Sequence, residues 1–279
     1  MLFIIDTYSV LYRLFFALPE LTSKNTPINA IYGLVKLMIK LTKEYKPKYL
    51  VFCVDKGKSD RDKVIKEYKA HRKPTSDKFK QQIPIFYEMA NSAGFKVFGI
   101  ENTEADDSIA TLTNIFKQQT QIYVLSGDKD LLQLLDNKKV FVLLMKKGIT
   151  DVDFYDDKKF KTEFGFDSNL YPYYKALVGD NSDNIKGVKG IGPKKAKEII
   201  QKYTNINEYL SSTLTPEDYK IFRNNLEVVI LKYKDISMNL EDLKISNDWY
   251  KKQEFINFIK KYNFVSILKE VEEKQLKLF

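Results

Sequence analysis

Residues 49–55 read YLVFCVD, six apolar residues that end in an aspartate, and this pattern recurs along the first half of the chain. Similar short apolar runs occupy residues 2–5, 96–100, 122–126 and 140–145. Amphipathic helices are predicted between them at residues 29–45, 80–93 and 105–118. Buried strands that alternate with helices are typical of a parallel sheet covered on both faces. We therefore predict an α/β fold with a mostly parallel, twisted sheet covered by helices.

The pattern changes beyond about residue 167, where apolar runs give way to lysine-rich amphipathic helices joined by glycine and asparagine turns. We expect an α/β domain at residues 1–167, a helical region at 168–265 and a charged C-terminal tail at 266–279.

Composition indicates an ordinary globular protein, since 44% of the 279 residues are hydrophobic and 30% are charged. No apolar run approaches the roughly 20 residues that a membrane-spanning helix needs, and the N-terminus lacks the basic flank of a signal peptide. The single cysteine, Cys53, cannot form an intramolecular disulfide, so we expect a cytoplasmic protein with no membrane partner. The net charge of +9 is compatible with a polyanionic partner but does not by itself identify a nucleic acid.

Acidic residues follow the predicted strands. In an open parallel sheet, ligands bind beyond the carboxyl ends of the strands. Asp6 and Asp55 end two strands directly, and further acids follow in ENTEADDS, GDKD and GDNSDN. These further acids are Glu104, Asp106, Asp107, Asp128, Asp130, Asp180 and Asp183. We expect them to converge on one edge of the sheet.

So many carboxylates do not remain ionised together without cations, because mutual repulsion raises their pKa values. Mg²⁺ and Mn²⁺ prefer oxygen ligands, and two such ions can activate water and orient a phosphodiester. With one cysteine and one histidine, the chain has no Cys/His zinc set. Any single Asp after a strand more often forms a turn or caps a helix than binds a metal. Asp106 and Asp107, taken alone, could simply stabilise the start of a helix through its dipole. The recurrence at four strand ends favours a metal site.

Six blocks of the sequence together form a recognisable pattern: IID (4–6), DKGKS (55–59), EYKAHRKP (67–74), EADD (104–107), SGDKD (126–130) and LVGDNSDNIKGVKGIGPKKA (177–196). On these blocks the chain resembles the 5′ nuclease family, which includes the 5′-exonuclease domain of bacterial DNA polymerase I, phage 5′-exonucleases and flap endonucleases. The blocks follow the family order, and the last is the most specific. Two departures are Thr7 in place of the usual glycine and one residue missing between Asp55 and EYKAHR.

This resemblance implies a PIN-like catalytic sheet in a free-standing form without a polymerase domain. It also implies two groups of metal ligands, with Asp107 nearby or shared. The first group is Asp6, Asp55, Glu104 and Asp106, and the second is Asp128, Asp130, Asp180 and Asp183.

Residues 56–80 are dominated by lysine and arginine, which on composition alone usually indicates a solvated helix face. Because this run follows Asp55, it must lie beside the acidic edge, and the resemblance implies a helical arch near residues 60–80. Lys69 and Arg72 match arch positions that would neutralise the scissile phosphate, and Tyr68 could stack on an unpaired base. Pro74 is expected to end the arch helix.

The segment GVKGIGPKKA (187–196) lacks the GK[ST] ending of a P-loop and does not follow a strand, so a nucleotide site is disfavoured. A helix–hairpin–helix at about 184–202 is the better interpretation, because its glycines would let a DNA phosphate approach a helix start. In the family this element often holds a monovalent cation such as K⁺. The residues that we expect to contact DNA here are Gly187, Lys189, Gly190, Gly192, Lys194, Lys195 and Lys197. Arg13 and Lys175 are further expected phosphate contacts.

The tail QLKLF resembles the peptide by which bacterial replication proteins bind the sliding clamp, through Gln275, Leu276, Leu278 and Phe279. The alternative is a final helical turn that packs back on the fold.

The sequence therefore predicts a monomeric, structure-specific 5′→3′ exonuclease and flap endonuclease that uses two Mg²⁺ or Mn²⁺ ions. Its expected substrates are DNA with 5′ flaps, nicks or ends and RNA–DNA primers, in replication and repair at the nucleoid. A PIN-like ribonuclease would also place acids on a parallel sheet, although the helix–hairpin–helix pattern disfavours it. A catalytically silent DNA-binding scaffold would be expected only if key acids had been lost.

Overall fold

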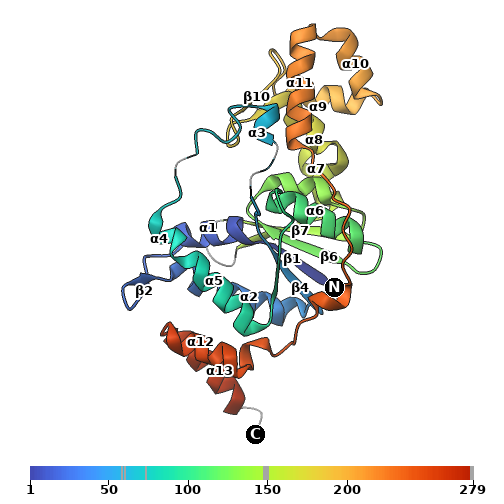
Figure 1. Cartoon of the computed structure of the whole chain (residues 1–279). Helices are drawn as coiled ribbons and strands as arrows, with labels where there is room; N and C mark the ends of the chain where they lie inside the picture. The colour runs from blue at the N-terminus through green and yellow to red at the C-terminus, as the bar shows by residue number, and fades with distance from the viewer. Residues whose placement is uncertain (58, 60, 73, 147–150, 277–279) are drawn as a thin grey trace.

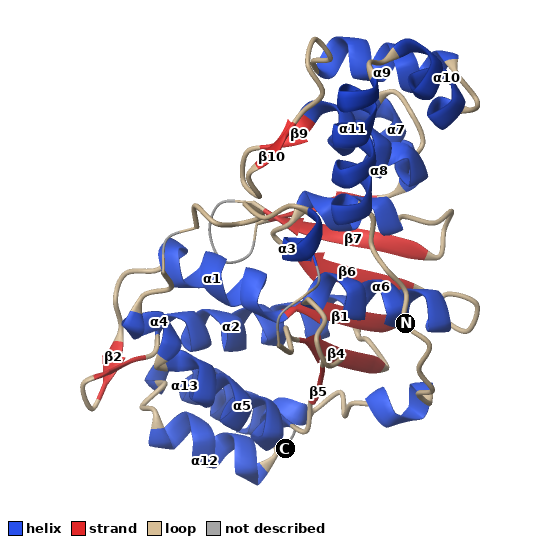
Figure 2. Cartoon of the chain, turned by 45° about the horizontal axis from the view of Figure 1, so that its top comes forward, coloured by secondary structure: helices blue, strands red, loops and turns tan. Residues whose placement is uncertain are grey.

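The structure is a computed structural model that describes residues 1–57, 59, 61–72, 74–146 and 151–276. A six-stranded sheet with the order β5-β4-β1-β6-β7-β8 forms its centre (Figure 2). Its strands are β1 (Leu2–Asp6), β4 (Tyr49–Cys53), β5 (Lys96–Phe98), β6 (Ile122–Ser126), β7 (Val140–Met145) and β8 (Val152–Tyr155). All neighbours are parallel except β7 and β8, which are antiparallel. The predicted mostly parallel sheet is confirmed, with β8 as an added edge strand.

One face of the sheet packs against helices from both ends of the chain (Figure 1). These helices are α1 (Thr7–Ala17), α2 (Asn29–Tyr45), α5 (Gln82–Ala93), α12 (Gln253–Lys261) and α13 (Val265–Leu276). Trp249 begins the return of the chain to this face: it is fully buried, and its Nε1 donates to Thr42 Oγ1 at 3.1 Å. The structure thus departs from the expected helical region at 168–265, because large apolar residues after Trp249 complete the core of the α/β domain instead.

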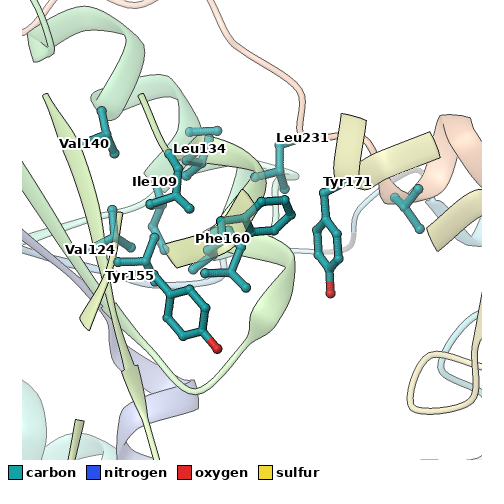
Figure 3. Packing of buried hydrophobic residues seen from close by; sticks show 14 of the residues in the cluster. Ile109, Val124, Leu134, Val140, Tyr155, Phe160, Tyr171 and Leu231 are labelled. Atoms are coloured by element: carbon teal, nitrogen blue, oxygen red, sulfur yellow. The ribbon is translucent and has the colours of Figure 1, made fainter. Parts of the chain in front are cut away.

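The opposite face packs against α6 (Ala105–Phe116), η1 (Lys129–Leu134) and α7 (Asp157–Phe164). The same core continues into α8 (Tyr171–Val178), α9 (Pro193–Lys202), α10 (Ile206–Thr213) and α11 (Pro216–Val229). Figure 3 shows Ile109 and Val124 of the sheet domain in one cluster with Tyr171 and Leu231. Burial of each large apolar side chain stabilises the folded state by about 1.5–3 kcal/mol, so this shared core holds α8–α11 against the sheet.

The segment between β4 and α5 does not form one helix that continues to Pro74. Its described residues contain the short helices α3 (Arg61–Val64) and α4 (Asp77–Lys80), so α3 ends well before Pro74. Residues after Val64 instead form turns, and Lys69 has a positive φ of 55°. These turns lie on the loop near residue 183: Lys69 N donates to Asp183 O at 3.0 Å, and Asn184 Nδ2 donates to Glu67 O at 2.8 Å. Contacts with this loop replace helical hydrogen bonds.

The remaining elements are short. They are the hairpin strands β2 (Thr22–Ser23) and β3 (Thr26–Pro27), the strands β9 (Gly179–Asp180) and β10 (Ile185–Lys186), and the 3₁₀ turns η2 (Ser168–Leu170), η3 (Leu240–Leu243) and η4 (Trp249–Lys251). None of the helices in the described part of the chain has the length and apolar character needed to cross a membrane.

Candidate active site

A cleft of about 1340 Å³ opens at the carboxyl edge of the sheet. It is lined by acids from four distant segments of the sequence, namely Asp6, Asp55, Glu104, Asp106 and Asp128. The parallel register explains this: Asp6 at the end of β1 pairs with Cys53 at the end of β4, and Asp55 follows two residues later. Five of the predicted acids therefore share one cleft.

Local hydrogen bonds hold three of these carboxylates in place. Asp6 caps α1, accepting from Ser9 N at 3.4 Å and from Ser126 Oγ at 2.6 Å. Asp55 Oδ1 accepts from Ala105 N at 2.7 Å. Asp128 caps η1 by accepting from Asp130 N at 2.8 Å. The capping role that the sequence offered as an alternative is thus real, and it coexists with a position in the cleft.

The acids at the base of the cleft repel one another. Burial, with the charges of Asp128 and Asp55, raises the pKa of Asp6 to about 7. Burial and the charges of Asp6 and Asp128 raise the pKa of Asp106 well above its ordinary value. Within the described residues, the Asp106 carboxylate makes no hydrogen bond or ion pair. A half-buried, repelled carboxylate without a partner is the kind of group that a cation stabilises.

Basic side chains neutralise the outer acids. Glu104 Oε2 accepts from Lys69 Nζ at 2.9 Å and from Arg61 Nη1 at 3.0 Å. Burial alone would raise the pKa of Glu104, but Lys69 and Arg61 lower it below its ordinary value. Arg72 Nη2 donates to Asp183 Oδ1 at 2.5 Å. The two expected arch cations therefore lie against acids of the site.

Lys175 bridges two acids that were predicted for a second metal group, Asp130 and Asp180. Burial and the charge of Asp128 raise the pKa of Asp130 to about 7. Burial alone would raise the pKa of Asp180 as well, but the bonds from Lys175 and Ser182 lower it to about 2. The Lys175 side chain is 12% exposed and its ammonium is held by these two carboxylates, so the expected phosphate contact at Lys175 stays a prediction that requires these ion pairs to open.

The donor chemistry suits divalent metal ions, since the cleft offers carboxylate oxygens and an unpartnered Asp106. Among the described residues, however, no three acidic, histidine or cysteine side chains already surround one point as a finished metal site. Lys69 and Lys175 bind carboxylate oxygens of acids that the sequence predicted as ligands, so a metal ion on those oxygens would displace these ammonium groups. Asp106, Asp130 and Asp183 also line a second, small cavity.

Two predicted site residues are absent from the cleft lining. Asp107 is 4% exposed and is not in the cleft lining; it accepts from Arg61 Nη2 at 2.6 Å and from Lys232 N at 2.9 Å. In this structure it is an ion-pair partner inside the protein, which fits a place near the expected ligand groups and not among them. Tyr68 packs against the hydrophobic core, and its hydroxyl donates to Glu104 at 3.4 Å. Its ring is not the free stacking face that the sequence suggested.

The hairpin between α8 and α9 has the geometry of a close backbone turn. At Gly187 an added Cβ would lie 2.3 Å from Val178 O, so the two chain segments touch there. Gly190 has a φ of +73°, which favours glycine. Around Gly192, the N-cap of α9, an added Cβ would meet nothing within 4 Å. The start of α9 is thus open to an approaching group.

The lysines of this element divide into two sets. Lys189, Lys194 and Lys195 are exposed near the start of α9. Lys197 instead turns toward α7, where its Nζ donates to Glu163 O at 3.4 Å and lies 5.7 Å from the Phe164 ring centroid. The expectation of a DNA contact at Lys197 is therefore weakened by its packing on α7.

Arg13 lies in the cleft wall, where it donates to Lys146 O at 2.9 Å and to Gly127 O at 3.4 Å. At the C-terminus, Gln275 and Leu276 end α13, whereas Leu278 and Phe279 lie outside the described residues. The clamp-binding tail accordingly stays a prediction.

Comparison with known proteins identifies the family. A model described as "5'-3' exonuclease, N-terminal resolvase-like domain" matches residues 1–165, and one described as "5'-3' exonuclease, C-terminal SAM fold" matches residues 166–251. The chain is 36% identical over 282 residues to the 5'-3' exonuclease of Aquifex aeolicus, covering 98% of this chain and 95% of that protein. The chain belongs to the 5′-3′ exonuclease family.

Other members of this exonuclease family are parts of longer proteins. DNA polymerase I of Caldicellulosiruptor bescii is 38% identical over 285 residues, and the chain spans about a third (33%) of the polymerase's length.

Solved structures share the exonuclease fold. A T5 5'-exonuclease with bound zinc superposes with a TM-score of 0.67 at 22% identity, covering 99% of this chain and 98% of that one. The catalytic core of Rad2 in complex with a DNA substrate gives a TM-score of 0.62 at 16% identity, covering 97% of this chain and 90% of that one.

Two features of the site were not predicted from the sequence. Arg61 lies between two aspartates in a charged run, which is typical of a solvated helix face, yet its side chain is 4% exposed. The second feature is an aromatic wall of the cleft, formed by Tyr8, Tyr12 and Phe16 on successive turns of α1. Phe16 is 66% exposed. The four-residue spacing of these aromatics was the available signal.

Proposed function

We propose that the chain is a divalent-metal-dependent nuclease that hydrolyses phosphodiesters of DNA near free 5′ ends, as a 5′→3′ exonuclease and flap endonuclease. The observation that carries the proposal is the cleft in which five acids from four distant segments of the sequence meet beside Lys69 and Arg72. Family membership supports the reaction class. A structural neighbour, the T5 D15 protein, is described as a flap endonuclease solved with DNA and metal ions.

The acids of the cleft are the groups that would hold the metal, and among them Asp106 is the one whose pKa the charges of Asp6 and Asp128 raise. Bound Mg²⁺ or Mn²⁺ would supply Lewis-acid polarisation of the phosphoryl group and a nucleophilic water at neutral pH. Asp128 and Asp6 also keep their helix caps, so their positions are set before any ligand binds.

Lys69 and Arg72 would bind the phosphate that undergoes cleavage. Both cations now neutralise acids at the cleft, and both lie in its lining. A phosphodiester that enters the cleft offers them a new anionic partner, and their charge would stabilise the charge that develops in the transition state. Lys69 reaches over the acids from the turn after α3, so phosphate and acids would meet between the sheet edge and this turn.

The duplex part of the substrate would bind at the start of α9. The open N-cap at Gly192 and the exposed Lys189, Lys194 and Lys195 suit a phosphate backbone, which makes binding salt-dependent and independent of base sequence. Carbonyls of the same hairpin could hold K⁺. Unpaired bases would contact the aromatic wall of the cleft, since stacking does not depend on base identity.

The proposal places the enzyme in replication and repair, where RNA–DNA primers and 5′ flaps arise, and hence in the cytoplasm at the nucleoid. The C-terminal QLKLF sequence would then bring it to the sliding clamp, with the enzyme acting as a monomer.

The test is the substitution Asp106→Asn, which removes a repelled charge without removing a hydrogen bond. The metal-free variant should be as stable as the parent or more so, and it should lose cleavage of an end-labelled flap in Mg²⁺ or Mn²⁺ by at least about 100-fold. Asp235→Asn is the matched control, because Asp235 is exposed and outside the cleft. Cleavage by Asp106→Asn at the parental rate would refute the proposed site.

A panel of substrates separates the alternatives. End-labelled flap, nicked and blunt duplexes and a single-stranded RNA are incubated with Mg²⁺, with Mn²⁺ and with EDTA. Preference for RNA over the flap would favour the ribonuclease, and metal-independent binding without any cleavage would favour the silent scaffold.

A further inference from the structure

Arg61 occupies an interior position between the helices α8–α11 and the acids of the cleft. It is the first residue of α3, and its side chain is 4% exposed. Its Nε donates to Val228 O at 2.8 Å, near the end of α11, while Nη1 and Nη2 donate to Glu104 and Asp107 at 3.0 and 2.6 Å. One planar guanidinium therefore holds α11 and the start of α6 in a fixed relation.

Other side chains of the α/β domain tie down the backbone that follows α11. Asp107 accepts from Lys232 N at 2.9 Å, and Thr111 Oγ1 accepts from Lys234 N at 3.1 Å. Gln133 accepts from Leu231 N at 3.1 Å and donates to Val229 O at 3.1 Å. We call Arg61, Asp107, Thr111 and Gln133 the α11 joint. Its members lie on α3, α6 and η1, so three separate elements of the α/β domain hold α11 and the residues that follow it.

Helix α11 also makes hydrogen bonds to the hairpin that leads into α9. Asn225, which is 3% exposed, donates through Nδ2 to Ala176 O at 2.9 Å and to Lys186 O at 2.8 Å. Lys186 directly precedes Gly187. A continuous path of directional contacts thus runs from the hairpin through Asn225 and Val228 to Arg61, and from Arg61 to Glu104 in the cleft.

We propose that Arg61 is a positioning residue that sets the cleavage register, the distance between the duplex-binding hairpin and the acids that act on the strand. This inference rests on the proposed function, because it assigns a role within that reaction. One nucleotide step along a duplex strand is about 3.4 Å, so a joint that loosens by a fraction of that distance changes which phosphodiester reaches the acids. Lysine cannot replace this arginine, because a single ammonium cannot hold three acceptors in one plane.

The experiment compares Arg61→Lys and Asp107→Asn with the control Asp62→Asn, whose exposed side chain lies next to the joint. Cleavage products of a flap substrate are mapped to the nucleotide. Arg61→Lys should raise cleavage one nucleotide from the main site about threefold or more relative to the main product, with duplex affinity within about twofold. The control should keep the parental product pattern.

A merely structural role would lower the melting temperature and the rate while leaving the product distribution unchanged, and that result would overturn the inference. A second readout does not depend on cleavage: spin labels at Lys96→Cys and Ser212→Cys, both exposed, report the distance between the two regions, and Cys53 is buried and stays unlabelled. Arg61→Lys should broaden that distance distribution, and an unchanged width refutes the joint. If the parent cleaves no flap yet the distribution broadens, the proposed function fails and the joint stands.

Discussion

Alanine at two glycines of the hairpin before α9 is expected to have different effects: Gly187→Ala should lower the stability of the protein, whereas Gly192→Ala should weaken its binding to DNA. At Gly187 the new Cβ would lie 2.3 Å from Val178 O and 2.6 Å from Val178 C, and backbone atoms cannot rotate away as a side chain can. Overpacking of this kind costs about 1–3 kcal/mol. At about 2–4 °C per kcal/mol, Gly187→Ala should lower the melting temperature by roughly 5 °C.

At Gly192 the same methyl group meets nothing within 4 Å, and the φ of −89° is accessible to alanine. Alanine is a poorer N-cap than glycine, but it gains about 0.4–1 kcal/mol by restricting the unfolded chain, so stability should change little. The methyl group would, however, stand where a phosphate approaches the first backbone N–H groups of α9. Loss of a charged hydrogen bond, about 1.5–3 kcal/mol, predicts duplex binding weaker by about tenfold or more.

The assay is fluorescence anisotropy with a blunt duplex between 50 and 200 mM salt, paired with thermal unfolding of both variants. Gly192→Ala should weaken binding at each salt concentration while keeping the parental slope of log K against log salt and the parental melting temperature, because it removes no cationic side chain. If Gly192→Ala bound DNA with the parental affinity, the start of α9 would not be a phosphate site. If Gly187→Ala had the melting temperature of the parent, the close approach of Gly187 to Val178 would be wrong.

Two further predictions concern stability. Trp249→Ala should cost about 3–5 kcal/mol in urea unfolding, because Trp249 is fully buried with its ring centroid 4.7 Å from that of Phe95; a loss below about 1 kcal/mol would contradict the packing of the C-terminal helices on the sheet domain. Without metal, the native state keeps protons on Asp6 and Asp130 up to about pH 7, whereas their ordinary pKa is 3.8, so their contribution to stability falls as the pH rises through this interval. Because Mn²⁺ relieves the repulsion between the ionised acids, the rise in melting temperature on adding Mn²⁺ should be larger at pH 8 than at pH 6. Scanning calorimetry at both pH values measures this rise. An equal or smaller rise at pH 8 would contradict the prediction.

Local patterns were enough to predict the sheet and the edge at which the acids gather. Buried strands are short apolar runs, and in a parallel sheet their carboxyl ends must share an edge, so Asp6 and Asp55 could be placed together without coordinates. The helix α2 (Asn29–Tyr45) has the predicted bounds, because its apolar periodicity is sustained over several turns. The short antiparallel strand β8 was not predicted, since four residues carry little periodic information.

The sequence alone therefore determined the fold class, the candidate acids and the family, because each depends on residue type and order along the chain. Tertiary structure decided which of these acids face the cleft. Asp106 lies in the cleft and Asp107 meets Arg61, since neighbouring residues on a helix point about 100° apart and only the packing of α6 selects the face. It also decided that Lys175 neutralises Asp130 and Asp180 and that the C-terminal helices return to the sheet. Such contacts join residues distant in sequence, and their energies depend on burial that no local pattern specifies.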